Sequence, residues 1–137
     1  MSPGSSLAAR LEAEHRSLDD LFGRFLAAAE TNEAAAALEA ITVFDDTLRR
    51  HTELEESDLY RAPGGQKLVT AGEETDEQRR DRELLLEHVQ IREVSGMMRR
   101  LLSERRDLPG ARALAANLAR RWDAHTVREE REVFPRL

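Results

Sequence analysis

The sequence contains no cysteine. This absence excludes disulfide staples, iron–sulfur clusters, thiol catalysis and zinc ribbons. It also fits a reducing cytosol, so we expect a cytoplasmic protein. Long hydrophobic runs are missing too, and no stretch is apolar enough or long enough to cross a membrane. Residues 1–6 are small and polar and lack the apolar core of a signal peptide.

The sequence has no excess of positive charge either. It holds 21 basic and 27 acidic residues, for a net charge of −6, and the two signs are mixed along the chain. Phosphate binding needs a concentrated basic face, so nucleic acid is not the expected main partner. Alanine, leucine, glutamate and arginine are abundant and favour helices. The length of 137 residues suits a single domain, 1–137.

Apolar residues recur at three- and four-residue steps, which is the helical period. This pattern predicts helices over about 6–30, 33–60, 75–102 and 109–134. The expected breaks are Thr31-Asn32, which suits a new N-cap, then 62–65 and 107–110, while Pro135 ends the last helix. Thr75 and Gln78 have the spacing of a capping box. Long helices with short connections predict an all-α, antiparallel up-down-up-down four-helix bundle.

An internal repeat surrounds the histidines. The chain holds only four of them: His15, His51, His88 and His125. The segments that begin at His51 and His125 both read His-Thr-x-x-Glu-Glu-x-x-aliphatic-aromatic. The other two contexts also match, as Glu14-His15-x-x-Leu18 and Glu87-His88-x-x-Ile91. The halves therefore look like two copies of one helical hairpin, offset by 73 to 74 residues.

The histidine spacing predicts that all four lie at one level of the bundle. In an antiparallel hairpin, residues equidistant from the turn lie at the same height. The point halfway between His15 and His51 is residue 33, and halfway between His88 and His125 lies between residues 106 and 107. The point halfway between His51 and His88 falls between residues 69 and 70. All three points lie in or beside expected turns, and each histidine shares a helix face with apolar residues.

Two glutamates join this level. Glu55 and Glu129 each follow a histidine by four residues, which places them one turn along the same inward stripe. Two carboxylates in an apolar core are costly unless they are paired or bound to metal. A lone core histidine is more often a packing residue than a ligand, but four matched contexts at one height favour metal. The sequence therefore predicts a site for two metal ions.

Other polar residues near the histidines have weaker claims. Asp19 lies one turn after His15 on the same face, where an extra ligand or a residue that orients one is the minor alternative, because the repeat places Arg92 at the equivalent position. Four further glutamates lie round their helices from the ligand stripe and are expected to be solvated or to contact the ligands: Glu14, Glu56, Glu87 and Glu130. Four aromatic residues are expected in the core, and a share in the wall of the site is the alternative: Phe25, Phe44, Tyr60 and Trp122.

These motifs resemble the hemerythrin-like, or HHE cation-binding, domain family. The resemblance rests on Glu14-His15, His51-x-x-x-Glu55-Glu56, Glu87-His88, His125-x-x-x-Glu129-Glu130 and Val133-Phe134-Pro135. It implies two iron ions in an oxo- or hydroxo-bridged centre, with Glu55 and Glu129 as bridges. By the same likeness, one iron takes His15 and His51, and the other takes His88 and His125.

The chain also departs from the oxygen-carrying members of that family. Those proteins have two histidines one turn apart on the third helix, whereas Leu84 and Arg92 flank His88 here. They also carry a terminal HxxxxD where this chain has HxxxE. By this comparison one iron lacks a protein ligand, which argues against stable reversible oxygen carriage and leaves room for water, a carboxylate or an external ligand.

The sequence leaves several functions open. Histidines and carboxylates without sulfur suit iron or manganese, and also zinc. With iron, we expect a protein that binds or reduces dioxygen, hydrogen peroxide or nitric oxide, in sensing, detoxification, storage or iron handling. With zinc or no metal, the bundle is a structural or interaction module. The sequence does not decide whether the protein is an enzyme, or whether it is a monomer or a homodimer.

Overall fold

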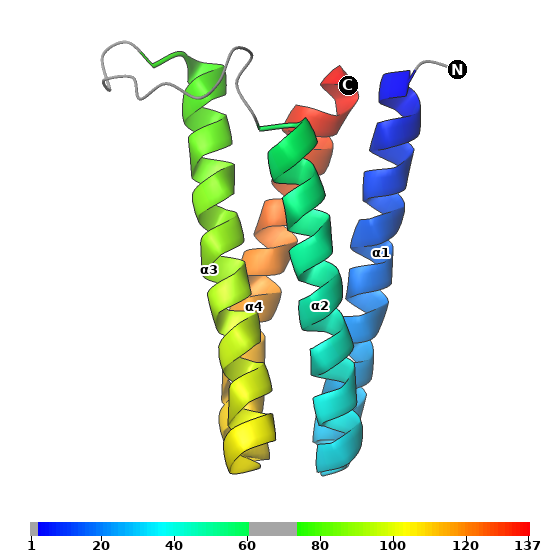
Figure 1. Ribbon diagram of the computed structural model, residues 1–137, viewed down its shortest axis with the longest axis vertical. Coiled ribbons are helices and arrows are strands. Elements are labelled where there is room, and N and C mark those ends of the chain that lie inside the picture. Colours follow the sequence, from blue (N-terminus) through cyan, green and yellow to red (C-terminus); the bar gives the residue numbers. More distant parts are fainter. Residues whose placement is uncertain (1–2, 61–73) are drawn as a thin grey trace.

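Four long antiparallel helices make up most of the chain in the computed structural model, which describes residues 3–60 and 74–137 (Figure 1). They are α1 (Pro3–Glu30), α2 (Ala34–Asp58), α3 (Asp76–Arg105) and α4 (Leu108–Arg128). Consecutive helices pack against each other, and α4 closes the bundle against α1. The predicted up-down-up-down bundle is confirmed. None of the helices in the described ranges is long and apolar enough to span a membrane.

The turn between α1 and α2 is built differently from the prediction. Asn32 adopts a left-handed conformation with φ 57° and ends α1, a role that asparagine tolerates better than most residues. The Thr31 hydroxyl donates back to the carbonyl of Ala27 at 3.2 Å. The N-cap of α2 is Glu33, whose side chain makes no capping bond. The predicted N-cap at Thr31-Asn32 is therefore wrong, because both residues finish the preceding helix.

The start of α3 is as predicted. The Thr75 hydroxyl accepts a hydrogen bond from the Gln78 amide, and the Gln78 side chain accepts one from the Thr75 amide. This capping box satisfies two amides that have no partner within the helix. The expected stop at residues 62–65 lies outside the described part of the chain.

The turn between α3 and α4 is shorter than the predicted break at 107–110. Arg106 is left-handed, with φ 49°, and the Asp107 side chain caps α4 by accepting from the Gly110 amide at 2.8 Å. Leu108 and Pro109 already belong to the helix, where the first turn tolerates proline. Gly110 leaves space for the cap, since an added Cβ would lie 2.2 Å from Asp107 Oδ2.

Replacing Asp107 by alanine is expected to lower the free energy of unfolding by about 1 kcal/mol, because the cap of α4 is lost. Gly110→Ala should cost a similar amount by displacing the same carboxylate. The double variant should then cost little more than either single variant. Urea unfolding followed by circular dichroism measures all three, and full additivity would contradict the shared mechanism.

The two helices that lead to Glu55 and Glu129, α2 and α4, end in a wider backbone turn than the prediction allowed. The predicted helix to residue 134 becomes α-helix only as far as Arg128, followed by a π-helix, Glu129–Val133, and a 3₁₀ turn, Phe134–Arg136. The α2 helix ends at Asp58 instead of residue 60. Both corrections have one cause, a hydrogen bond that spans five residues and departs from the α-helical ladder. It joins the Tyr60 amide to the Glu55 carbonyl, and the Phe134 amide to the Glu129 carbonyl.

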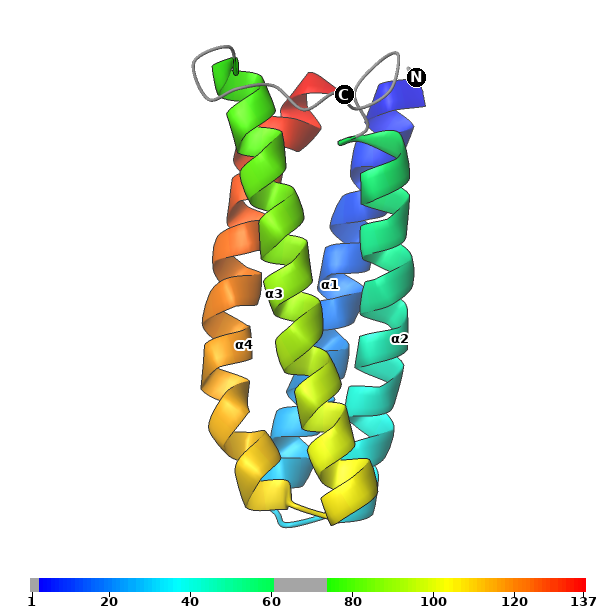
Figure 2. The ribbon, with the colours of Figure 1, turned by 60° about the vertical axis from the view of Figure 1, so that its left-hand side comes forward.

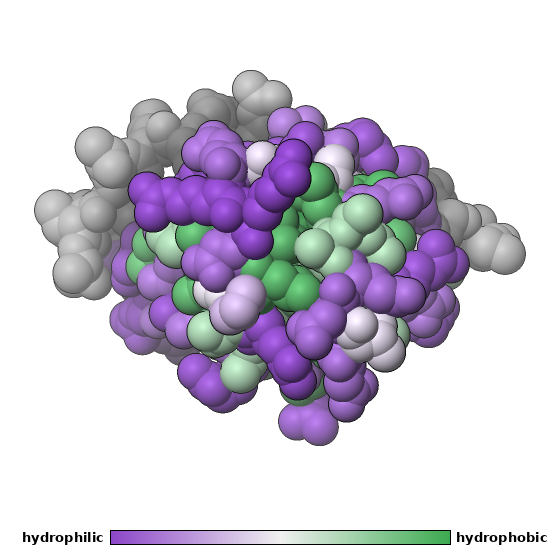
Figure 3. Space-filling model, turned by 90° about the horizontal axis from the view of Figure 1, so that it is seen from below, coloured by the Kyte–Doolittle hydropathy of each residue, from purple (hydrophilic) through white to green (hydrophobic). Residues whose placement is uncertain are grey.

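The core consists of two apolar clusters. The large cluster fills the half of the bundle that carries the two short turns, and it runs from Leu18 to Trp122. The small cluster lies toward the end that carries both termini (Figure 2). Its buried members are Leu11, Tyr60, Leu84, Val133 and Phe134. Seen from the short-turn end, apolar side chains gather at the centre and hydrophilic ones surround them (Figure 3). The histidine-bearing segments lie between the two clusters.

Candidate metal centre

The four histidines meet inside the bundle, one from each helix. Each is at most 2% exposed. The rings of His15 and His51 have centroids 4.9 Å apart, and those of His88 and His125 are 4.7 Å apart. The structure therefore brings together the residues that the turn-midpoint argument placed at one level.

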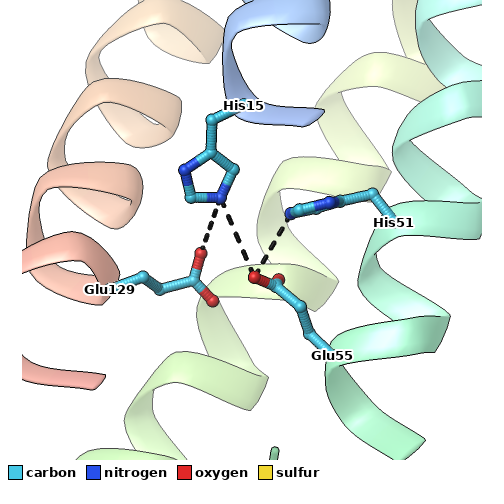
Figure 4. A group of neighbouring side chains, drawn as sticks. All are labelled: His15, His51, Glu55 and Glu129. Atoms are coloured by element: carbon cyan, nitrogen blue, oxygen red, sulfur yellow. Dashed lines mark ion pairs between the residues drawn. The ribbon is translucent and has the colours of Figure 1, made fainter. Parts of the chain in front are cut away.

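Two fully buried carboxylates lie between the histidine pairs. Glu55 is 3.2 Å from His51 Nε2 through Oε2, and its Oε1 is 3.0 Å from His88 Nε2. Oε1 of Glu129 lies 3.1 Å from His15 Nε2 and 3.2 Å from His125 Nε2. Figure 4 shows His15 from α1, His51 and Glu55 from α2, and Glu129 from the π-helix after α4 pointing toward one another. Each carboxylate thus contacts both halves of the repeat.

These six residues form two potential metal-binding groups that share the glutamates. One group contains His15, His51, Glu55 and Glu129. The other contains Glu55, His88, His125 and Glu129. In each group the potential ligand atoms lie within 4.8 Å of one another. The division matches the pairing that the family resemblance implied, with the two carboxylates common to both groups.

The inward atoms of this cluster lack hydrogen-bond partners. They are Nε2 of all four histidines, both carboxylate oxygens of Glu55, and Oε1 of Glu129. Buried polar groups are normally satisfied, and leaving one unpaired costs about 1–3 kcal/mol. Seven such atoms converging on one place fit a site that cations complete. The buried His/Glu cluster therefore fits a metal site.

Four outer glutamates surround the centre, and each contacts one histidine through Nδ1, on the side of the ring that faces away from the centre. Each accepts a hydrogen bond from Nδ1 of a histidine on the next helix, at 2.7 or 2.8 Å. The pairs are Glu14 with His51, Glu56 with His88, Glu87 with His125, and Glu130 with His15. An ionised carboxylate can only accept, so Nδ1 of each ring carries the proton. The four glutamates therefore turn every Nε2 inward, as metal-binding histidines require.

Arginines donate to three of these outer glutamates, and the exposed Arg10 does so to Glu14 at 3.2 Å. Arg92 donates to Glu56 at 2.6 Å, and Arg128 donates to Glu87 at 3.2 Å. The pKa of Glu56 is lowered, first by its hydrogen bond with His88 and then by Arg92. Burial raises the pKa of Glu87, but His125 and Arg128 outweigh this effect and lower it. Both carboxylates stay ionised and keep the histidine tautomers fixed.

Burial and charge compete at the inner residues. Burial lowers the pKa of His15, but the carboxylates of Glu129 and Glu55 outweigh it and raise the pKa to about 10. The same balance raises the pKa of His88 to about 10. Burial raises the pKa of Glu129, but His125, His15 and His88 lower it well below its usual range. Without metal, protons on His15 and His88 therefore balance the charge of the two central carboxylates.

Replacing Glu87 by glutamine is expected to weaken metal binding about 10- to 100-fold, the usual effect of losing a group that orients a ligand. Glutamine keeps the size of the side chain but no longer requires a proton on Nδ1 of His125. Glu83→Gln is the matched control, because Glu83 pairs with the same Arg128 and touches none of the six inner residues. Competition with a chromophoric chelator measures both, and equal affinities would contradict the role given to Glu87.

Several expectations for other residues are resolved. Asp19 does not join the cluster; it accepts a hydrogen bond from Trp122 Nε1 at 2.7 Å. Trp122 lines the site from the large cluster, with its ring centroid 5.3 Å from that of His15. Leu84 packs in the small cluster, so neither it nor Arg92 replaces the missing histidine. The four further glutamates were expected either to be solvated or to contact the ligands. The structure shows the second, because each accepts a hydrogen bond from a histidine.

Tyr60 has a more specific place than its predicted share in the wall. Its hydroxyl donates to Glu129 Oε2 at 2.5 Å, and its ring lies 5.7 Å from that of His88. Burial, together with Glu129 and Glu55, raises the pKa of Tyr60 far above its ordinary value. The sequence repeat could have indicated that Tyr60 lies beside the site, because it aligns Tyr60 with Phe134, nine residues after a site histidine in each case.

Comparison with known families finds a match for the first hairpin of the chain. The model of the Hemerythrin HHE cation binding domain matches residues 2–63. The matched segment contains His15, His51 and Glu55, and it confirms the resemblance seen in the sequence over this half. No curated protein and no solved structure matches the chain. For His88, His125 and Glu129, the assignment to the same kind of site depends on the internal repeat and on the geometry above.

Proposed function

We propose that this protein, whose first hairpin matches the hemerythrin HHE cation-binding domain, is a non-haem di-iron protein that binds or reduces a small oxidant. The oxidant is dioxygen, hydrogen peroxide or nitric oxide. One observation carries the proposal: two groups of buried ligand atoms share Glu55 and Glu129, and most of those atoms have no hydrogen-bond partner.

The ligand atoms favour iron. Imidazoles and hard carboxylates suit iron and manganese, and the chain has no cysteine to favour softer ions. Bound iron would supply electrons for the reduction of a small molecule, one from each ion. The residues would fix two ions side by side, because Glu55 and Glu129 each contact histidines of both groups. The outer glutamates would hold the four rings in place as the charge at the centre changes.

The enclosure of the centre favours a small ligand. None of the six inner residues is more than 2% exposed. Trp122 and the large cluster cover one side, while Leu11, Tyr60, Leu84 and Phe134 cover the other. Such walls exclude bulk water and leave no room for a large substrate beside the histidines. Diatomic molecules and hydrogen peroxide are small enough to reach them, in sensing, detoxification or iron handling.

Metal content by plasma mass spectrometry, with an absorption spectrum of the same aerobic sample, tests the proposal. We expect about two irons per chain, one for each potential ligand group, with near-ultraviolet bands of a bridged diferric centre. Adding hydrogen peroxide or nitric oxide to the reduced protein should change that spectrum. A protein that takes up zinc but no iron, even after anaerobic reconstitution with ferrous ion, would instead be a redox-silent helical module.

A further inference from the structure

The two halves of the centre are related by the internal repeat, and the relation extends to the aromatic residues that close it. Tyr60 and Phe134 are separated by the same 74 residues as His51 and His125. The backbone amide of each aromatic residue donates to the backbone carbonyl of the central glutamate five residues earlier. Tyr60 donates to Glu55, and Phe134 donates to Glu129. The two residues therefore occupy equivalent places in the two hairpins.

Each aromatic ring also covers a histidine of the other hairpin. The Tyr60 ring centroid lies 5.7 Å from that of His88, and the Phe134 centroid lies 5.3 Å from that of His15. Both aromatic residues are buried in the small cluster. The two halves of the site thus have the same histidines, glutamates and aromatic covers. Between the two equivalent covers, Tyr60 and Phe134, the difference is one atom, the hydroxyl oxygen of Tyr60.

That oxygen lies against Glu129, one of the two carboxylates that both ligand groups share. It is 2.5 Å from Glu129 Oε2, which in turn is 3.6 Å from His88 Nε2. Leu84 and Arg92, which flank His88 by one turn, offer no ligand to this ion. The phenol lies on the same side of the site as the group that contains His88.

We propose that the phenol oxygen of Tyr60 is a ligand of the ion held by His88 and His125. The inference rests on the proposed di-iron function and makes the two ions unequal. One ion gains an oxygen ligand from the chain, while the ion held by His15 and His51 faces the apolar ring of Phe134. Coordination displaces the phenol proton to solvent, as it does for other protonated ligands, because the cation favours the anionic form.

Spectroscopy of the iron-loaded protein and of two matched variants tests the inference. A phenolate bound to ferric iron gives a visible charge-transfer band, and excitation in that band enhances tyrosine ring vibrations in the resonance Raman spectrum. We expect both signals in the unmodified protein. Tyr60→Phe should lose both while keeping the same iron content. Phe134→Tyr, the matched control, should retain the original band. The double variant should show a phenolate band from the tyrosine at position 134, bound to the ion held by His15 and His51.

The outcomes separate the two proposals. If the protein binds about two irons but shows neither the band nor the ring vibrations, the Tyr60 inference is overturned and the di-iron proposal stands. A band that persists unchanged in Tyr60→Phe overturns it as well. If the protein binds no iron, both proposals fail. The Raman measurement on the unmodified protein decides the question even if Tyr60→Phe does not fold.

Discussion

Alanine at position 129 is expected to abolish binding of both metal ions at a concentration that saturates the unmodified protein. Glu129 belongs to both potential ligand groups and touches His15 on one side and His125 on the other. Alanine at His125, by contrast, removes a member of one group only and should leave metal at the His15–His51 position. Metal content after gel filtration measures the loss. Trp122, the single tryptophan, lies beside His15 and should report binding through fluorescence quenching.

The same change should also destabilise the metal-free fold. Removing one partner of a buried charge cluster typically costs about 3–5 kcal/mol, because the remaining charges are left uncompensated. Here the charges left behind are on His15 and His88, whose raised pKa values depend on Glu129. Glu132→Ala is the matched control, since the Glu132 side chain is half exposed and pairs with Arg128 alone in the contacts described. If Glu129→Ala still binds both ions, the bridging role is wrong.

Much of the centre could be predicted because antiparallel helices impose simple geometry. The turn midpoints placed the four histidines at one level, and the four-residue step placed Glu55 and Glu129 on the same stripe. Both arguments need only the helical period and the positions of the breaks. The structure brings these six residues together, and their role as metal ligands remains the proposal.

Other features depend on how the helices are rotated and packed. The sequence could not say which histidine each outer glutamate would hold, because Glu14 faces His51 only after α1 and α2 have docked. The link from Asp19 to Trp122 likewise joins α1 to α4 across the bundle. The backbone bonds that span five residues have no hydrophobic period of their own. They were missed even though they orient Tyr60 and Phe134.

Metal uptake is expected to release protons, so that affinity rises with pH. In the metal-free protein, the pKa values of His15 and His88 are raised to about 10, and both rings are therefore protonated at neutral pH. A metal ion needs the unprotonated Nε2 and must displace these protons. Each proton released makes binding tenfold tighter per pH unit, so the two protons on His15 and His88 contribute roughly a hundredfold rise per unit below pH 10. The pKa of His125 is also raised, and any proton that His125 or Tyr60 releases adds to this rise.

The stability of the metal-free fold depends on pH in the opposite direction: the contribution of these histidines falls as pH rises. The folded state holds protons on His15 and His88 that the unfolded chain loses near the ordinary histidine pKa of 6.5. Their contribution is fully present below pH 6.5 and is lost as pH rises toward 10. The metal-bound protein has no such protons to lose. Stabilisation by metal, measured as the difference in melting temperature between the two forms, should therefore widen from neutral to alkaline pH.

Calorimetric titration with zinc, in buffers of different ionisation enthalpy at one pH, counts the released protons directly. We expect about two per chain from these histidines at neutral pH, and about one fewer in His15→Ala. Arg16→Ala, next in sequence and exposed, is the matched control and should release as many protons as the unmodified protein. An affinity that is independent of pH, with no buffer dependence of the binding enthalpy, would show that the inward nitrogens carry no protons before metal binds.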